Sequence, residues 1–441
     1  MQIPETLKQR LARWAYTFLL LLILPLVPFY LWKRARKQPA YRQDWAQRFF
    51  GSTGLPRTSE KRMWVHAVSV GETHAIAPLV FLWEKHHPGT QWVFTSTTPT
   101  GRETAQQVFR DIANKRFVYL PYDLPWAVHR FLNQLNARMG WLVETELWPN
   151  LLHGAERKNV PMALLNARVS PTTAEQLQRY RALSEPALRR LGVVICQTQA
   201  DANAFSGLGR VPDAVAGNLK FDVNPKPELL DLGRTWRQQW DATTVFLAAS
   251  TREGEESLLL QAWQNQLSAA LPTALPALLV VPRHPQRFAE VADLFESAGF
   301  FVSRRSEGFP KPQVSGMPTV LMGDSMGEMP AYYASADIAF MGGSWAPLGG
   351  QNLIEACACD CPVLLGPYTF NFAKASEDAL AVGAALRFEN ISDAMDWAVS
   401  KRMTGATFTT ERSAAQAYAK QHRGAATTSF TVLQQRLASI R

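Results

Sequence analysis

The sequence predicts an α/β protein with two Rossmann-like, doubly wound domains behind an N-terminal membrane-anchor helix. Short apolar, β-branched runs alternate with helical patterns along the body of the chain, and one uncharged stretch, 14–32, precedes them. With 441 residues, 47% of them hydrophobic, the chain is long enough for two or three domains with sizeable cores.

The positive charge of the chain is concentrated beside this uncharged stretch. The formal net charge is +9, and residues 1–62 hold 12 Lys/Arg against 3 Asp/Glu, which accounts for the whole excess. No basic stripe with interleaved aromatic residues occurs elsewhere in the sequence. A basic flank next to an apolar segment indicates an anionic membrane surface as the partner and does not indicate nucleic acid.

Residues 1–45 are therefore expected to form a membrane anchor with its basic flank. Nineteen residues over 14–32 span about 28 Å as a helix, close to the bilayer core of about 30 Å. More Lys/Arg follow the stretch than precede it, so the body should face the cytoplasm. Pro25 and Pro28 also allow a bent, half-inserted helix, whereas the long apolar run without a small-residue cleavage site disfavours a cleaved signal peptide.

The first domain is expected over 46–223. Its opening strand begins at Trp64, and the helix 100–112 starts with a capping box from Thr100 to Glu103. The other expected elements are helix 73–86, strand 91–96, strand 117–120, helix 125–135, strand 139–144, helix 151–158, strand 160–166, helix 173–191 and strand 193–197.

A linker is expected over 224–230, which contains two prolines, followed by a second domain over 231–409. Its expected elements are strand 245–249, helix 255–269, strand 277–282, helix 285–298, strand 319–322, helix 328–336, strand 338–341, helix 352–358 and strand 362–365. The helical pattern over 410–441 should pack back on the first domain. Two such halves usually bind a ligand in the cleft between them.

Glu72 is the first candidate for chemistry. The strand from Trp64 ends at a Ser/Val/Gly turn, so Gly71 and Glu72 lie at the carboxyl end of a strand, where open α/β sheets bind ligands. The helix dipole and free backbone N–H groups keep a carboxylate ionised there, as a general base requires. The alternative is that Glu72 only caps its helix, and this stretch alone favours capping.

Three strand ends in the second half favour a nucleotide site. Arg283 follows one strand and offers paired donors for phosphate, although alone it would be interpreted as a surface ion pair. The turn 323–328 follows the next strand. The loop 342–352 holds two Gly-Gly pairs before a helix N-terminus, and Glu355 in that helix could accept hydrogen bonds from a ribose. The loop is neither a Walker A nor a dinucleotide motif.

The four cysteines, Cys196, Cys357, Cys359 and Cys361, give no disulfide framework and favour a reducing compartment. Cys-x-Cys-x-Cys is interpreted as buried small hydrophobic residues, because no histidine is spaced to complete a metal site. No metal is expected.

A series of motifs makes the chain resemble the Kdo transferases, from the anchor nearly to the C-terminus. The motifs are Arg36-Lys37-x-Pro39-Ala40-Tyr41-Arg42, Val68-Ser69-Val70-Gly71-Glu72, Glu144-Thr145-Glu146-Leu147-Trp148-Pro149-Asn150, Asn166-Ala167-Arg168, Gly217-x-Leu219-Lys220-Phe221-Asp222, Pro282-Arg283-His284-Pro285, Gly323-Asp324-x-Met326-Gly327-Glu328 and Thr369-Phe370-Asn371-Phe372. These enzymes of lipopolysaccharide inner-core biosynthesis move 3-deoxy-D-manno-octulosonic acid (Kdo) from CMP-Kdo to a lipid A precursor, lipid IVA.

The resemblance implies the GT-B architecture and an inverting, metal-independent glycosyltransferase without a cofactor. It also implies the inner, cytoplasmic membrane of a Gram-negative bacterium, with the catalytic body on the cytoplasmic face. By this resemblance Glu72 is the general base, and Glu144 and Lys220 stabilise the transition state. The residues implied to contact CMP are Pro282, Arg283, Met326, Gly327, Glu328, Asn352, Leu353, Ile354 and Glu355.

Some positions depart from the family pattern or stay open. Leu353-Ile354 replaces another residue pair, and 345–348 is a variable loop. Glu146 competes with Glu144, because residues two apart on a strand point the same way. Two other functions also remain. The first is a membrane-associated GT-B transferase that uses a UDP-sugar and would need neither the Ser-Val-Gly-Glu turn nor Glu-Leu-Trp-Pro-Asn. The second is a non-catalytic nucleotide-sugar binder, which could lose Glu72 without consequence.

Overall fold

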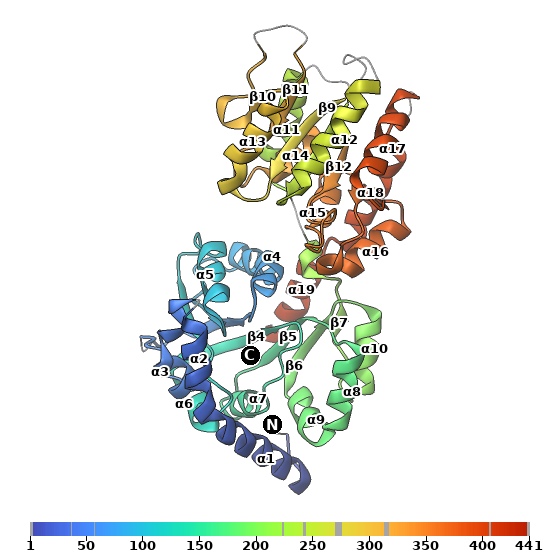
Figure 1. Ribbon diagram of the computed structural model, residues 1–441. Helices are drawn as coiled ribbons and strands as arrows, with labels where there is room; N and C mark the ends of the chain where they lie inside the picture. Colours follow the sequence, from blue (N-terminus) through green and yellow to red (C-terminus); the bar gives the residue numbers. More distant parts are fainter. Residues whose placement is uncertain are drawn as a thin grey trace. The chain divides into compact units, whose positions relative to one another are not determined.

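The computed structural model describes residues 3–36, 38–56, 58–222, 225–240, 244–269, 276–312, 317–404 and 407–438 (Figure 1). The chain divides into two compact units: unit 1 is Met1–Asp222 with Arg423–Arg441, and unit 2 is Val223–His422. Each unit holds a seven-stranded sheet whose paired strands are all parallel. The predicted fold class, two doubly wound Rossmann-like units, is confirmed.

The sheet of unit 1 has the strand order β3-β2-β1-β4-β5-β6-β7. The chain builds outward from β1 in one direction through β2 and in the other through β4, so the strand order reverses between β1 and β4. Open α/β sheets bind ligands at the carboxyl ends of the strands at such a point. The strands are β1 Arg62–His66, β2 Trp92–Ser96, β3 Lys115–Tyr119, β4 Ala137–Val143, β5 Met162–Ala167, β6 Leu191–Cys196 and β7 Ala214–Val215.

Helices cover both faces of this sheet. Helices α4, α5 and α19 pack on one face, and α6, α7, α9 and α10 pack on the other. The helices of unit 1 are α1 Leu7–Ile23, α2 Val27–Ala35, α3 Trp45–Phe50, α4 Val70–His86, α5 Pro99–Val108, α6 Pro125–Leu135, α7 Pro149–Arg157, α8 Pro171–Arg179, α9 Arg181–Arg189, α10 Gln199–Gly207 and α19 Ala425–Ala438.

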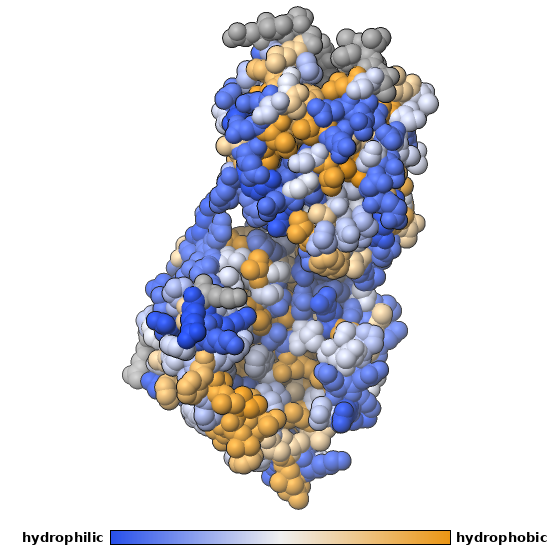
Figure 2. Space-filling view, viewed as in Figure 1, coloured by the Kyte–Doolittle hydropathy of each residue, from blue (hydrophilic) through white to orange (hydrophobic). Residues whose placement is uncertain are grey.

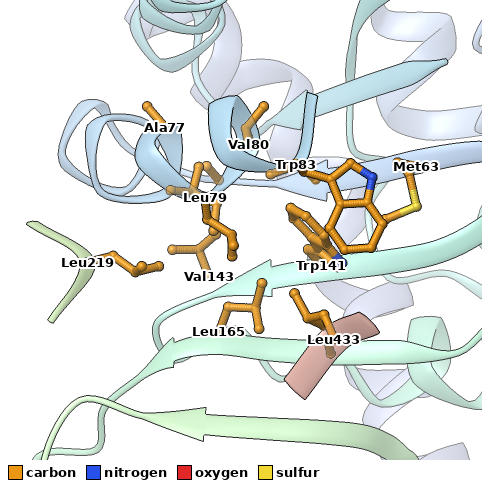
Figure 3. Close-up of a cluster of buried hydrophobic side chains, with 14 of the residues drawn as sticks. Met63, Ala77, Leu79, Val80, Trp83, Trp141, Val143, Leu165, Leu219 and Leu433 are labelled. Carbon is orange, nitrogen blue, oxygen red and sulfur yellow. The ribbon is translucent and has the colours of Figure 1, made fainter. Parts of the chain in front are cut away.

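The core of unit 1 has large aromatic side chains on both faces of the sheet. In β1, Met63 and Val65 belong to one apolar cluster and Trp64 to the other, which explains why the strand is apolar at successive positions. On the α4 side, Trp83 meets Trp141 of β4 edge to face, with ring centroids 5.3 Å apart (Figure 3). Leu433 of α19 belongs to the same cluster, so the end of the chain completes this core.

The sheet of unit 2 has the order β10-β11-β9-β8-β12-β13-β14 and reverses between β8 and β12. Its strands are β8 Val245–Thr251, β9 Ala277–Pro282, β10 Phe301–Arg304, β11 Thr319–Met322, β12 Ile338–Met341, β13 Val363–Leu365 and β14 Ala385–Arg387. Helices α12, α13 and α17 share one apolar cluster with this sheet. The helices are α11 Pro227–Gln239, α12 Glu255–Ala269, α13 Phe288–Ser297, α14 Met329–Ser335, α15 Leu353–Ala358, α16 Ala373–Ala381, α17 Ile391–Met403 and α18 Thr409–His422.

Several expected segments differ from the structure. The expected helix 173–191 is two helices, α8 and α9. The helix expected to start with a capping box from Thr100 to Glu103 instead starts at Pro99, with Thr98 as its N-cap.

The expected linker 224–230 contains the start of α11 at Pro227, because proline suits the first turn of a helix; position 224 lies outside the described residues. The expected helix 410–441 is two helices. Helix α18 contacts α15 in unit 2, whereas α19 contacts α4 in unit 1. Gly424 separates them with a φ of 95°, a conformation that glycine adopts readily.

One helical segment among the described residues, Leu7–Ala35, is long and apolar enough to cross a membrane by length and composition. It consists of α1, a 3-10 turn over Leu24–Leu26 that contains Pro25, and α2.

Candidate active site

The structure gathers the predicted catalytic residues at the point in unit 1 where the strand order reverses. Glu72 lies in the first turn of α4, just after β1, and Glu144 directly follows β4. Lys220, from the 3-10 turn Leu219–Phe221, approaches both: its Nζ lies 2.9 Å from Glu144 Oε1, and its charge acts on Glu72. The three side chains come from segments far apart in the sequence.

Glu72 does cap its own helix, as the simpler interpretation requires. Ser69 is the N-cap of α4 and its Oγ accepts from the Glu72 N–H at 3.2 Å. The Glu72 carboxylate in turn accepts from Val68 N at 2.7 Å and from Ser69 Oγ at 2.9 Å. Burial nevertheless raises the pKa of Glu72, against the lowering effect of these hydrogen bonds. A raised pKa makes this partly buried carboxylate a stronger base, so capping and proton transfer are compatible.

Glu144 and Glu146 do not point the same way, which corrects the strand-based argument. Strand β4 ends at Val143, and Glu144 has a left-handed φ of 65°. A non-glycine residue rarely adopts this conformation, and such residues cluster at functional sites. Glu144 Oε1 accepts from Lys220 Nζ at 2.9 Å, and Oε2 lies 3.3 Å from Arg168 Nε. Glu144, rather than Glu146, therefore pairs with Lys220.

Glu146 instead lies against aromatic side chains. Its Oε2 accepts from Trp148 Nε1 at 2.6 Å and is 3.8 Å from His66 Nε2. Burial raises the pKa of Glu146 to about 7, with the charges of Glu72 and Glu144 adding to the effect. Burial also lowers the pKa of His66 to about 4. His66 is therefore neutral at pH 7 and its contact with Glu146 is not an ion pair.

The loop that carries Lys220 is positioned by side-chain amides. Asn166 Oδ1 accepts from Leu219 N at 2.9 Å, and Asn218 Oδ1 accepts from Lys220 N at 3.0 Å. Leu219 itself is buried in the core of unit 1. A Cβ at Gly71 would lie 3.8 Å from Lys220 Nζ, so the turn before Glu72 borders the same site. Asn166 belongs to a motif of the sequence analysis that had no assigned role.

The predicted nucleotide residues all belong to unit 2. Arg283 follows β9 and is exposed, and it forms no ion pair within the described part of the chain. Glu355 lies in α15, where burial raises its pKa and the charge of Arg283 lowers it. Pro282 is the buried last residue of β9. Arg283 is thus available to an anionic ligand at the carboxyl edge of the sheet.

The glycine loop that follows β12 is held by a residue that the sequence analysis missed. Glu255, 1% exposed at the start of α12, accepts from Gly343 N at 2.7 Å and from Trp345 N at 3.0 Å. A Cβ at Gly342 would lie 2.2 Å from the carbonyl oxygen of Ser250, so β8 and this loop touch at the reversal point. Glu255 appeared in the sequence only as an ordinary first-turn acid of a helix.

Several of the other predicted nucleotide residues already have hydrogen-bond partners in the chain or are buried. Glu328 receives two hydrogen bonds from Arg305, at 3.1 and 3.0 Å, and another from Ser325. Met326 is exposed, and Gly327 has a φ of 82°. Asn352 Oδ1 accepts from Ile354 N at 3.1 Å, so it occupies one N–H of the α15 N-terminus. The side chains of Leu353 and Ile354 are buried, and the backbone N–H of Ile354 is the one that Asn352 occupies.

The four cysteines are free and buried. Across the described ranges, no group of three or more His, Cys, Asp or Glu side chains could hold a metal ion.

Comparison with known proteins identifies the family. A family model described as 3-Deoxy-D-manno-octulosonic-acid transferase (kdotransferase) matches residues 43–223. The 3-deoxy-D-manno-octulosonic acid transferase of Bordetella pertussis is 40% identical over 423 residues, which cover 94% of this chain and 97% of that protein. The protein of the same name from Haemophilus influenzae is 35% identical over 396 residues, or 88% of this chain and 90% of that protein.

A solved structure supports the fold. UDP-GlcNAc 2-epimerase from Neisseria meningitidis matches with a TM-score of 0.51 at 12% identity, over 86% of this chain and 100% of that chain. This likeness concerns the two-unit Rossmann-like architecture alone. The activity follows from the relatives of high identity, which match nearly the whole chain and confirm the resemblance of its motifs. The chain therefore belongs to the 3-deoxy-D-manno-octulosonic acid transferases, glycosyltransferases of lipopolysaccharide biosynthesis.

Proposed function

We propose that this chain transfers Kdo from CMP-Kdo to a lipid A precursor, lipid IVA, by an inverting displacement that needs no metal ion. The observation that carries the proposal is the grouping of Glu72, Glu144 and Lys220 where the strand order of unit 1 reverses. A base and an ammonium–carboxylate pair at one sheet edge suit a sugar transfer with a charged donor.

In the proposed step Glu72 accepts the proton of the acceptor hydroxyl. The oxygen attacks the anomeric carbon of Kdo while the bond from that carbon to the CMP phosphate oxygen breaks, and the electron pair leaves with CMP. One displacement inverts the anomeric centre. The raised pKa of Glu72 increases its strength as a base, and its hydrogen bonds from Val68 and Ser69 fix its orientation.

Glu144 and Lys220 then stabilise the charges of the transition state. The Lys220 ammonium can offset the donor carboxylate or the departing phosphate, while the Glu144 carboxylate favours an oxocarbenium-like carbon. Their 2.9 Å contact, together with Arg168, holds both groups in place before the donor arrives. Because these charged groups are already in place, they need not move to stabilise the transition state.

Unit 2 is proposed to bind CMP. Arg283 supplies a guanidinium without an ion pair in the described ranges for the phosphate, and Glu355 can accept from the ribose. The glycine loop, which Glu255 fixes through the N–H groups of Gly343 and Trp345, leads to the N-terminus of α15. Lys220 in unit 1 and Arg283 in unit 2 are each a cation that can neutralise a phosphate, so the proposed step needs neither metal nor cofactor. We place the reaction on the cytoplasmic face of the inner membrane, in line with the basic flank of the apolar segment 14–32.

The test is transfer itself. Detergent-solubilised full chain is incubated with CMP-Kdo, generated in situ because the donor is labile, and with tetraacylated lipid A precursor, with and without EDTA. Mass spectrometry should show a gain of one or more Kdo units that EDTA leaves unchanged. Transfer from a UDP-sugar but not from CMP-Kdo would contradict the proposed donor, and loss of activity in EDTA would contradict the metal-independent step.

The matched variant is Glu72→Gln. Its side-chain oxygen can still accept from Val68 N, so the helix cap is largely kept while the base is lost. We expect no measurable transfer but nearly unchanged CMP binding by calorimetry, because Glu72 belongs to unit 1 and the nucleotide residues to unit 2. Substantial residual transfer by Glu72→Gln would reject Glu72 as the base.

A further inference from the structure

The first helix of the chain is attached to the body of unit 1 by buried polar contacts. Arg190, whose side chain is 2% exposed, lies 2.9 Å from Glu5 Oε1 and 2.8 Å from Glu156 Oε2. Glu5 also pairs with Arg13 of α1 at 3.0 Å. Glu5, just before α1, therefore joins Arg13 of α1 to Arg190, which follows α9 in the body of the unit.

The attachment continues one turn further along α1. Thr17 is buried, and its Oγ1 accepts from Asn150 Nδ2 at 3.0 Å. Asn150 is itself fixed by Asp123, which accepts from its backbone N–H at 2.9 Å. Thr17 lies within the apolar stretch, so contact with the body extends into the segment that would occupy the bilayer core of a spanning helix.

The other end of the segment is attached to the same unit. Leu31 and Ala35 of α2 form a buried cluster with Tyr41, against which residues of α3 pack. Helix α3 is joined to the body through Arg48, which donates to the carbonyl oxygen of Thr97 at 2.7 Å. Both ends of the 29-residue segment Leu7–Ala35 thus contact unit 1.

These attachments do not fit a helix that crosses a bilayer. Crossing a hydrocarbon core of about 30 Å would place the two ends of the segment on opposite sides. It would also detach Glu5 from the body, so that buried Arg190 would lose one of its two carboxylate partners and keep only Glu156. Removing a partner from a buried charge is destabilising.

The opposite face of the segment is apolar and exposed. Large side chains gather there, among them Trp14, Phe18, Leu22, Leu26 and Phe29, which are 60–73% exposed. Figure 2 shows hydrophobic residues concentrated over α1 and α2 at the lower end of the view. Single exposed hydrophobic residues are ordinary, whereas a contiguous patch marks an interaction site.

Basic side chains border this patch at both ends. Lys8 and Arg10 are exposed beside the start of α1, and Lys33, Arg36 and Arg42 are exposed at the end of α2 and just beyond it. Exposed lysine and arginine next to an apolar face are attracted to anionic headgroups, and tryptophans such as Trp14 and Trp32 suit the headgroup level. The chemistry of the patch matches an anionic lipid surface.

We propose that α1 and α2 lie in one leaflet of an anionic membrane, with the apolar face in lipid and the polar face docked on unit 1, and that this segment does not cross the bilayer. The Pro25 turn between the two helices lets the segment follow the body instead of running straight. This inference concerns membrane topology and stands apart from the proposed reaction.

The test is proximity in native membranes of the full chain. In the double variant Thr17→Cys/Asn150→Cys, a short bifunctional thiol reagent should link α1 to the body of the membrane-bound protein. After proteolysis of the chain between positions 17 and 150, the link appears as a gel shift. The matched control is Phe18→Cys with Asn150→Cys, because Phe18 is the next residue and 62% exposed. The native cysteines are buried, so background labelling is small. Equal linking in both pairs, or none in either, would overturn the docking.

A second measurement does not depend on that pair. Pro4→Cys and Phe50→Cys, both at exposed positions on either side of the segment, are treated with a membrane-impermeant maleimide in inside-out and right-side-out vesicles. Both sites should react in the same vesicle type and neither in the other. Reaction in opposite vesicle types would show that the segment crosses the bilayer. Failure of the wild-type chain to float with vesicles of phosphatidylethanolamine and phosphatidylglycerol would reject the lipid partner.

Discussion

Neighbouring carboxyl groups in unit 1 differ because their surroundings differ. Glu144 lies between the cations of Lys220 and Arg168, whereas Glu146 lies against Trp148 and neutral His66 and keeps its proton up to about pH 7. Such contrasts between adjacent carboxyl groups are how sites divide acid and base roles. The sequence placed both residues in one motif, but could not separate them, since the left-handed backbone of Glu144 depends on partners distant in the chain.

Glu146 should make the stability of unit 1 depend on pH. The folded chain keeps this proton up to about pH 7, while the unfolded chain releases it near 4.5. The folded state therefore binds more protons in between, so the free energy of unfolding falls as pH rises from about 4.5 to 7. We expect Glu146→Gln to remove this slope and to be more stable than wild type at pH 8, by on the order of 3 kcal/mol at most.

Urea unfolding of both proteins at pH 5 and pH 8 measures this effect. The contribution of His66 is common to the two proteins and cancels in their difference. A stability difference that stays the same at both pH values would show that Glu146 is ionised in the folded chain.

Arg283 should contribute to donor binding. It is exposed and has no ion pair within the described ranges, so its removal should cost little stability. We expect Arg283→Ala to weaken CMP binding by about 1.5–3 kcal/mol, the usual value of a charge-assisted hydrogen bond. Isothermal titration with CMP checks this, and Lys311→Ala, which removes the same charge from another exposed position of unit 2, should bind normally. An equal loss of CMP affinity in the two variants would indicate that only the net positive charge of unit 2 matters, and not a direct contact with Arg283.

At the scale of elements, the strand–turn–helix units could be predicted from the sequence because the residue patterns that specify them are local. Apolar runs mark the strands, and a helix was expected after each of β1 and β2. The cap after β2 was placed two residues too late, because Thr98 and Thr100 are both suitable capping residues and only the structure shows that Thr98 accepts from Gly101 N. The support of the glycine loop was not readable, since Glu255 precedes Gly343 by 88 residues. Only the register of β8 beside β12 brings the carboxylate to the loop. Contacts of this kind follow from strand order, which periodicity does not specify.

Glu255 should therefore stabilise the loop more than its position in a helix suggests. Replacing it with glutamine leaves a single side-chain acceptor for the N–H groups of Gly343 and Trp345. Each buried N–H without a partner costs about 1–3 kcal/mol. We expect Glu255→Gln to lower the melting temperature of unit 2 and to weaken CMP binding, measured by calorimetry.

The control for this prediction is Glu253→Gln, which changes the same side chain at an exposed position two residues earlier. It should leave both quantities unchanged. An unaltered melting temperature in Glu255→Gln would mean that the loop does not depend on the buried carboxylate.

At the scale of the whole molecule, unit 1 contains both ends of the chain. Asp222 accepts from the backbone N–H groups of Gly424 and Ala426, at 3.2 and 2.6 Å, so the end of the first segment caps the start of α19. The two-domain pattern was predicted from the sequence. The helix break at Gly424 was not, because the helical pattern continues across it and the choice between units depends on tertiary contacts.

Phe430 carries much of the attachment of α19. It is 7% exposed and lies against Trp83, with ring centroids 5.4 Å apart. Truncating a buried phenylalanine typically costs about 3–5 kcal/mol. We expect Phe430→Ala to raise amide exchange in unit 1 while unit 2 stays protected, as hydrogen-exchange mass spectrometry would show. Thr431→Ala, at the exposed neighbouring position, should behave as wild type, and exchange that rises equally in both units would contradict the assignment of α19.

The place of α19 in unit 1 also sets the order in which the protein can fold during its synthesis. The ribosome must add the whole of Val223–His422 before the last helix emerges, which takes on the order of 10–40 s at typical bacterial and eukaryotic elongation rates. During that interval the apolar cluster between α4 and the first sheet, which contains Trp83, lacks Phe430 and Leu433. Unit 2 can finish folding first, and the nascent chain presents an apolar surface that a chaperone can bind until translation ends.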